Sequence, residues 1–148
     1  FHFIFAILAI INFAQSKAEF HGLNKKEFQD LQRKLLEECR VEFNVDKNKV
    51  EDFLKIENDV PNEEDYKKVL ACYTGKLGFV SDNNKVNWEK LRLAAEILFQ
   101  DNKDYHDKSL NVIKDCEGKS YEELVRTELA HKFAKCLKQG LSQAGVKL

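Results

Sequence analysis

Four cysteines, Cys39, Cys72, Cys116 and Cys136, are the residues whose type and spacing best define a chemistry in this sequence of 148 residues. Cysteines can bind a metal as thiolates or pair as disulfides. Successive cysteines are separated by 32, 43 and 19 residues, no C-x-x-C pair occurs, and no H-x-x-x-H pattern supplies nitrogen ligands. Two disulfides are therefore favoured over a metal site, and four cysteines leave three connectivities open.

Residues that could act in catalysis are few. No G-x-S-x-G, H-E-x-x-H, P-loop or G-x-G-x-x-G motif occurs. His106 and Asp107 are adjacent, but the cysteines and the glycine-rich calcium loop that accompany such a pair in secreted phospholipases are missing. His21 and His131 are expected to be solvated, although either could titrate near neutral pH. We expect no enzyme activity, no cofactor and no bound metal.

The first 18 residues, FHFIFAILAIINFAQSKA, differ from the rest of the chain in being almost entirely apolar, with one charge at Lys17. The run is too short to span a bilayer, and the small residues Ser16 and Ala18 fit the recognition site of signal peptidase. We expect a signal peptide over residues 1–18, with cleavage after Ala18, and a single secreted domain over 19–148. Removing the segment takes away one basic and no acidic residue, so the net charge changes from −1 to −2.

The charge balance limits the partners of this domain. With 24 Lys and Arg against 25 Asp and Glu, the chain lacks the excess of basic residues that nucleic-acid binding requires. Beyond the signal peptide we expect no stable insertion into a membrane. The oxidising conditions outside the cell make disulfides the default state of the cysteines.

Apolar residues recur at three- and four-residue steps along nearly all of 19–148, which predicts an all-α domain of about six short helices. Asn24 precedes the first helix, and Asp46, Asn62 and Asn87 are expected to cap the second, third and fourth helices, because Asn and Asp side chains accept hydrogen bonds from the backbone of the first turn. Several apolar faces are wider than a simple bundle needs. This width favours a cage of helices around a hydrophobic cavity.

The end of the chain is expected to hold the sixth helix and a tail. Ser120 with Glu123 matches the capping-box pattern, so the helix should begin at about Tyr121. Gly140 is expected to end the helix, and residues 141–148 are expected to form a short polar tail without structure of their own.

The leader, the size, the helicity and the cysteine spacing together resemble the insect odorant-binding protein family, in its branch with four cysteines in place of six. The resemblance covers residues 23 to about 140. The two cysteines missing from the six-cysteine pattern correspond to Lys68 and Thr127. Ala130, Phe133 and Cys136 resemble the pattern that leads into the final cysteine of the family.

The resemblance implies disulfides from Cys39 to Cys72 and from Cys116 to Cys136. The missing third bridge would leave the third and sixth helices held by packing, with Lys68 near Glu128. A conflict remains, because a helix from Tyr121 would carry Cys136 roughly 22 Å along its axis, whereas a disulfide needs Cα atoms within about 7 Å. Either residues 117–124 fold back or the two helices cross steeply.

The resemblance also implies a secreted carrier that binds small hydrophobic ligands, such as odorants, pheromones or lipid-like molecules, in an internal cavity. A chemosensory receptor is a further candidate partner, and the protein is expected to be a monomer or a weak homodimer. Apolar residues on the helix faces are expected to line the cavity, with Tyr73 and Trp88 as polar handles. The expected lining is Leu31, Leu35, Phe53, Leu70, Tyr73, Thr74, Trp88, Leu91, Ala95, Leu98, Leu110, Ile113, Leu129, Phe133 and Leu137.

The alternative is a secreted helical signalling protein of the cytokine type, which shares the size, the leader and two disulfides. That class has fewer and longer helices. Breaks at Pro61, at Gly75 and Gly78, at Asn102 and at Gly118 cut this chain into shorter pieces, which favours the carrier.

Overall fold

The computed structural model describes residues 18–57 and 59–148, so the predicted signal peptide lies outside the described residues apart from Ala18. Six α-helices and one 3-10 helix make up the described chain, and beyond an isolated bridge between Val80 and Val86 these residues hold no paired strand. The all-α prediction is confirmed. The elements are α2 (Lys25–Glu42), α3 (Lys47–Glu51), η1 (Asp52–Leu54), α4 (Glu64–Lys76), α5 (Trp88–Leu98), α6 (Lys103–Glu117) and α7 (Arg126–Gln143).

Side-chain caps form at Asp46 and Asn87 as predicted, but not at Asn62. Asp46 accepts a hydrogen bond from the backbone of Asn48 at 2.8 Å, whereas α4 follows Glu63 and has no side-chain cap. Asn24 accepts a hydrogen bond from the backbone of Glu27 at 2.9 Å, and the Glu27 carboxylate accepts one from the Asn24 backbone at 3.2 Å. Asn87 accepts one from the backbone of Lys90 at 3.1 Å. These bonds satisfy amide groups that have no partner inside the helix.

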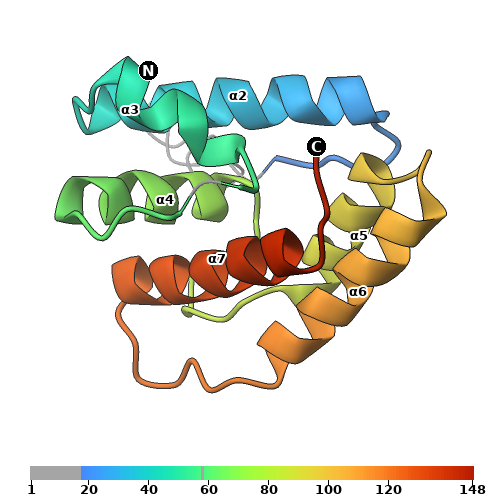
Figure 1. Cartoon of the computed structure of the whole chain (residues 1–148). Coiled ribbons are helices and arrows are strands. Elements are labelled where there is room, and N and C mark those ends of the chain that lie inside the picture. The colour runs from blue at the N-terminus through green and yellow to red at the C-terminus, as the bar shows by residue number, and fades with distance from the viewer. Residues whose placement is uncertain (1–17, 58) are drawn as a thin grey trace, which may run out of the picture.

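The helices pack as a short stack that is closed at one end. In Figure 1, α2, α4 and α7 lie one below another, while α5 and α6 stand beside them at one end of the molecule. The helix α4 packs against both α2 and α7, and α6 packs against both α5 and α7. The side chains that meet between them, Phe20, Phe28, Leu70, Leu129 and Phe133 among others, are almost completely buried.

Two disulfides tie neighbouring helices. Cys39 on α2 bonds to Cys72 on α4, and Cys116 on α6 bonds to Cys136 on α7, which is the pairing that the resemblance implies. The capping box at Ser120 and Glu123 was wrong, because α7 begins only at Arg126 and Glu123 adopts a left-handed φ of 62°. The loop between α6 and α7 runs away from α6 along the lower edge of the molecule in Figure 1, and α7 then runs back toward α6. The Cα atoms of Cys116 and Cys136 thereby lie 6.0 Å apart.

The C-terminal segment also differs from the sequence prediction. The helix α7 runs through Gly140 to Gln143, and a Cβ atom at Gly140 would lie 2.5 Å from Cγ1 of Val112 on α6. Gly140 therefore permits a close approach of two helices and does not end one. The tail is not free of structure either, because Val146 is buried with 2% exposure.

Candidate functional site

The residues predicted to line a cavity all lie in the core or against it. Leu31, Trp88, Leu98, Leu110 and Leu137 are partly buried at its edge. Thr74 is buried, and its hydroxyl donates to the Leu70 carbonyl at 2.8 Å, so that polar group is satisfied within α4. The buried members of the core cluster are Leu35, Phe53, Leu70, Tyr73, Leu91, Ala95, Ile113, Leu129 and Phe133.

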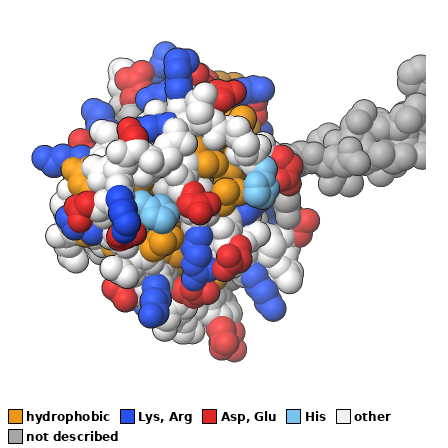
Figure 2. Space-filling model, turned by 90° about the vertical axis from the view of Figure 1, so that its right-hand side faces the viewer, with side chains coloured by type: hydrophobic (Ala, Val, Ile, Leu, Met, Phe, Trp, Pro, Cys, Tyr) orange, Lys and Arg blue, Asp and Glu red, His pale blue; other side chains and the backbone are white. Residues whose placement is uncertain are grey.

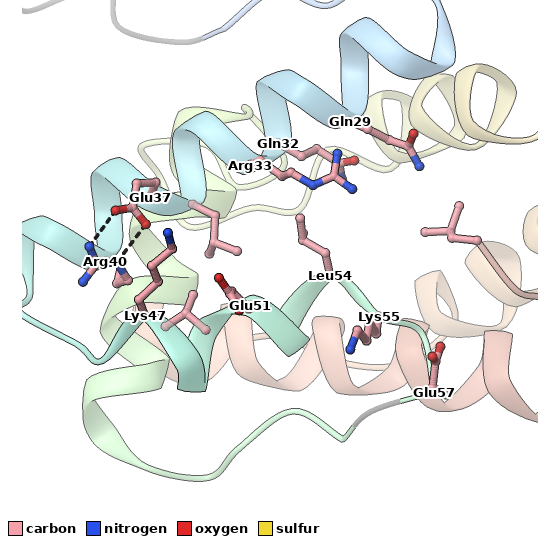
Figure 3. A pocket seen from close by; sticks show the side chains of 13 residues that line it. Gln29, Gln32, Arg33, Glu37, Arg40, Lys47, Glu51, Leu54, Lys55 and Glu57 are labelled. Carbon is pink, nitrogen blue, oxygen red and sulfur yellow. Dashed lines mark hydrogen bonds and ion pairs between the residues drawn. The ribbon is translucent and has the colours of Figure 1, made fainter.

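A groove of about 810 Å³ lies between α2 and the α3–η1 segment, within the size range of small-molecule sites. Leu36 and Val50 are buried in its floor, and Leu54 and the C-terminal Leu148 also line it. Figure 3 shows Gln29, Gln32 and Arg33 extending from α2 on one side of the groove, and Leu54 pointing toward α2 from η1 on the other. We name this feature the α2–η1 groove.

One end of the α2–η1 groove is fixed by Arg40. Its guanidinium binds both carboxylate oxygens of Glu37, at 2.6 and 2.8 Å, and it also donates to the backbone carbonyl of Val45 at 2.9 Å. The bond from Arg40 lowers the pKa of Glu37, which keeps that carboxylate charged. Arg40 thus holds α2 against the turn that precedes α3.

The rim of the groove carries charges of both signs. Basic side chains come from Arg33, Lys47 and Lys55, and acidic ones from Glu51 and Glu57. The rim therefore does not present charge of a single sign to a ligand.

A polar pair connects the groove with the interior. The Gln32 amide, which lines the groove, donates a hydrogen bond to the hydroxyl of Tyr73 on α4 at 3.1 Å. Burial raises the pKa of this hydroxyl well above its ordinary value, so it stays neutral. The rest of the Gln32 amide can still donate and accept hydrogen bonds at the groove surface.

Sequence reasoning missed the groove. None of the predicted lining residues lies in it, whereas Leu36, Val50 and Leu54 do. The signal was present, because Leu36 widens the apolar stripe of the first helix and the other two are apolar positions of the second. Periodicity identifies an apolar face but not whether protein or an open groove covers it.

Trp88 and Leu110 lie at two other hollows near α5 and α6. Trp88 packs against Tyr121 with ring centroids 5.7 Å apart. Leu110 lines a hollow with His106, whose Nε2 is buried without a hydrogen-bond partner among the described residues. Figure 2 shows this end of the molecule with Lys, Arg, Asp and Glu spread between small hydrophobic areas, and no extended patch of one charge.

The described residues show no arrangement typical of a metal site or a membrane span. No group of three or more His, Cys, Asp or Glu side chains comes together in the part of the chain that the structure describes. Within the same residues, no helix combines the length and the apolar character needed to cross a bilayer.

Comparisons with known proteins agree with the all-α fold of this chain. Residues 22–140 match the sequence model of the PBP/GOBP family. Among solved structures, odorant-binding protein dmelOBP28a from Drosophila melanogaster superposes with a TM-score of 0.68 at 16% sequence identity, over 83% of this chain and 99% of that chain. At that identity the likeness shows the fold alone. No curated protein sequence gives a significant match.

Proposed function

The chain belongs to the PBP/GOBP family, and from this premise we propose that it is a secreted carrier of small hydrophobic ligands such as odorants, pheromones or lipid-like molecules. Carriage requires an apolar surface that the ligand can occupy in place of water, and no covalent step. Family membership supports the class of binding protein, and the fold shared with an odorant-binding protein supports the architecture.

The observation that carries the proposal is the α2–η1 groove. Its buried floor, Leu36 and Val50, belongs to the same core cluster as most of the predicted lining residues. A ligand with one hydrocarbon chain would place the chain against this floor, where burial of apolar surface contributes about 25 cal/mol per Å². Gln32 would bind a single hydroxyl or carbonyl group of the ligand.

The predicted interior residues remain part of this proposal. We expect a ligand that enters by the groove to reach Leu35 and Leu70 only if the bond between Gln32 and Tyr73 opens. The groove would then be the entrance to the internal cavity that the sequence predicts. A chemosensory receptor would be the recipient of the ligand.

The test is displacement of an apolar fluorescent probe by long-chain alcohols, esters or acids. We expect the wild-type protein to bind the probe at micromolar concentration. Leu54→Trp, which fills the groove, should raise the Kd about tenfold, equivalent to about 1.4 kcal/mol. The matched control is Val41→Trp, because Val41 lies on α2 with 61% exposure and outside the groove.

The outcomes separate the site from the function. Absence of probe uptake by the wild-type protein would contradict carriage itself. Uptake that is equal in Leu54→Trp, Val41→Trp and wild type would leave carriage in place but move the ligand away from the groove.

A further inference from the structure

The α3–η1 segment, which forms one wall of the α2–η1 groove, has few neighbours among the helices. Among the described elements, α3 packs against α2 and η1, and η1 packs against α3. Leu54 ends η1 and Lys55 and Glu57 follow it, and all three line the groove (Figure 3). The position of this wall therefore depends on individual side-chain contacts.

One of these contacts comes from α7. The ammonium of Lys138 donates to the backbone carbonyl of Phe53 at 2.8 Å and lies 5.4 Å from the centroid of the Phe53 ring. The last carbonyls of a helix have no partner inside it, and a lysine ammonium is a suitable donor to them. Lys138 thus holds η1 by its backbone, one residue before Leu54.

The ring of Phe53 makes a separate contact with α4. Phe53 is buried with 7% exposure, and its ring stacks on that of Tyr66, with the centroids 6.5 Å apart and the planes at 3° to each other. Phe53 therefore reaches α4 through its ring and α7 through its carbonyl. The residue next to Leu54 is held by both helices.

The two ends of the wall are held by different helices. Arg40 of α2 donates to the Val45 carbonyl ahead of α3, and Lys138 of α7 donates to the Phe53 carbonyl in η1. The first bond joins the segment to the opposite wall of the groove, whereas no residue of α7 lines the groove. Because Lys138 holds η1 from outside the groove, its bond opposes movement of this wall relative to α2.

We propose that Lys138 is a positioning residue for ligand binding in the α2–η1 groove. Its bond to the Phe53 carbonyl keeps η1 in place, and loss of this bond shortens the time that a ligand stays bound. A wall that is no longer held must be ordered again whenever a ligand binds, so the affinity falls as well. The inference rests on the proposed function and deepens it by naming a residue that controls release.

The test compares Lys138→Met with Lys135→Met. Methionine keeps most of the side-chain volume and removes the ammonium. Lys135 is the matched control, because it is exposed one turn earlier on α7 and lines the same hollow behind the segment. In stopped-flow displacement of the bound apolar probe N-phenyl-1-naphthylamine, we expect dissociation to be about fivefold faster in Lys138→Met and unchanged in Lys135→Met. Equal rates in the two variants would overturn the proposal.

Hydrogen exchange of the ligand-free variants separates positioning from a general loss of stability. We expect Lys138→Met to exchange faster over residues 52–57 and as slowly as wild type in α5, which does not pack against α3 or η1. Faster exchange throughout the described helices would show a merely structural role and would overturn the proposal.

A conservative variant tests whether the hydrogen bond itself is needed. Lys138→Arg keeps a charged donor for the Phe53 carbonyl, and we expect it to release the probe at nearly the wild-type rate. Release as fast as in Lys138→Met would contradict a role for the bond.

The same measurements separate this proposal from the carrier function. Absence of probe uptake by the wild-type protein would contradict carriage and the positioning role together. Uptake by the wild type with equal release in all three variants would overturn the positioning role alone.

Discussion

The helix pairs of this molecule are held together in two ways. The α2–α4 and α6–α7 contacts each contain a disulfide, whereas the α4–α7 contact, where the two tied pairs meet, has none. An ammonium–carboxylate bond between Lys67 on α4 and Glu128 on α7, at 2.8 Å, lies there instead. The covalent bonds thus divide the stack into two tied units, and the seam between them depends on packing and on polar contacts.

In most polar contacts across the seam, a side chain of α7 binds a backbone carbonyl on the other side. His131 Nε2 lies 3.1 Å from the Pro61 carbonyl, Lys138 donates to the Phe53 carbonyl at 2.8 Å, and Arg126 donates to the Ser81 carbonyl at 2.7 Å. Pro61, Phe53 and Ser81 all lie outside α6, the helix to which the Cys116–Cys136 disulfide joins α7. A seam of this kind can open without breaking a covalent bond, which the tied pairs cannot do.

The resemblance to the four-cysteine branch predicts this weak point but names the wrong residue. Lys68, which occupies the position of a missing cysteine, is exposed, and its neighbour Lys67 is the lysine that binds Glu128. Lys67 also lies 3.4 Å from Glu64 and is only 9% exposed in its side chain. One residue along a helix turns the side chain by about 100°, so alignment to a cysteine position does not identify the contact.

The largest effect is expected from removing a disulfide. Cys39→Ala with Cys72→Ala opens a loop of 33 residues and should lower the free energy of unfolding by about 4 kcal/mol. Cys116→Ala with Cys136→Ala opens a loop of 20 residues and should lower it by about 3 kcal/mol. Urea unfolding measures both. A loss below about 1 kcal/mol in either pair would mean that the tied units owe little to their covalent bonds.

The next effect concerns the close packing of α6 on α7. Gly140→Ala brings a Cβ atom to 2.5 Å from Val112, and we expect a loss of about 1–3 kcal/mol from overpacking. The matched control is Gly118→Ala, where the nearest atom would be 3.5 Å away, and its effect should stay within about 0.5 kcal/mol. Thermal unfolding of the two variants decides. Equal stabilities would show that α6 and α7 can shift apart despite the disulfide.

Features of this fold that depend on neighbouring residues in the sequence were predictable. Features that depend on contacts between distant helices were not. Asn24 and Asn87 cap their helices through bonds to residues three positions ahead, so the sequence alone contains both partners. Ser120 and Glu123 carry the same local signal, but the chain there turns back to bring Cys136 to Cys116. Gly140 is likewise a helix-ending residue in isolation, and only its neighbour on α6 explains its place inside a helix.

The sequence predicted the apolar character of the candidate site but not which residues form it. Apolar faces wide enough for a cavity predict that a ligand surface exists. Tyr73 was expected as a polar handle, and the structure shows its hydroxyl bound to Gln32 of the groove. Gln32 itself carries no sequence signal, because a polar residue beside an apolar stripe is the ordinary pattern of an amphipathic helix.

A smaller effect is expected at the seam. Lys67→Met keeps most of the side-chain volume and removes the bonds to Glu128 and Glu64. We expect faster hydrogen exchange in α4 and α7 and faster release of a bound probe, with less loss of stability than Gly140→Ala. Lys68→Met is the control, since Lys68 is exposed. Identical exchange and release in the two variants would show that the bonds of Lys67 do not hold the seam.

The smallest effect is the pH dependence of the same contact. The hydrogen bond from Lys67 lowers the pKa of Glu128 below its ordinary 4.5, and the hydrogen bond to Glu128 raises the pKa of Lys67 above 10.5. Glu64 of α4 and His131 of α7 are the other titratable groups beside the pair. A lowered carboxylate pKa stabilises the fold above 4.5, and this contribution is lost as the pH falls through the folded value. A raised lysine pKa stabilises the fold below 10.5, and this contribution is lost as the pH rises through the folded value.

We therefore expect a plateau of stability between these limits, with a shallow loss at each side that Lys67→Met abolishes. Glu128→Gln should remove the acid-side loss through this pair. Measurement of the unfolding midpoint from pH 3 to pH 7 in wild type, Lys67→Met and Glu128→Gln isolates the acid limb. If all three profiles run parallel, the acid loss comes from carboxylates elsewhere, and the Lys67–Glu128 pair contributes nothing to stability. The contrast with the disulfide-tied pairs would then be sharper, because the two units would meet with no specific polar bond between α4 and α7 that contributes to stability.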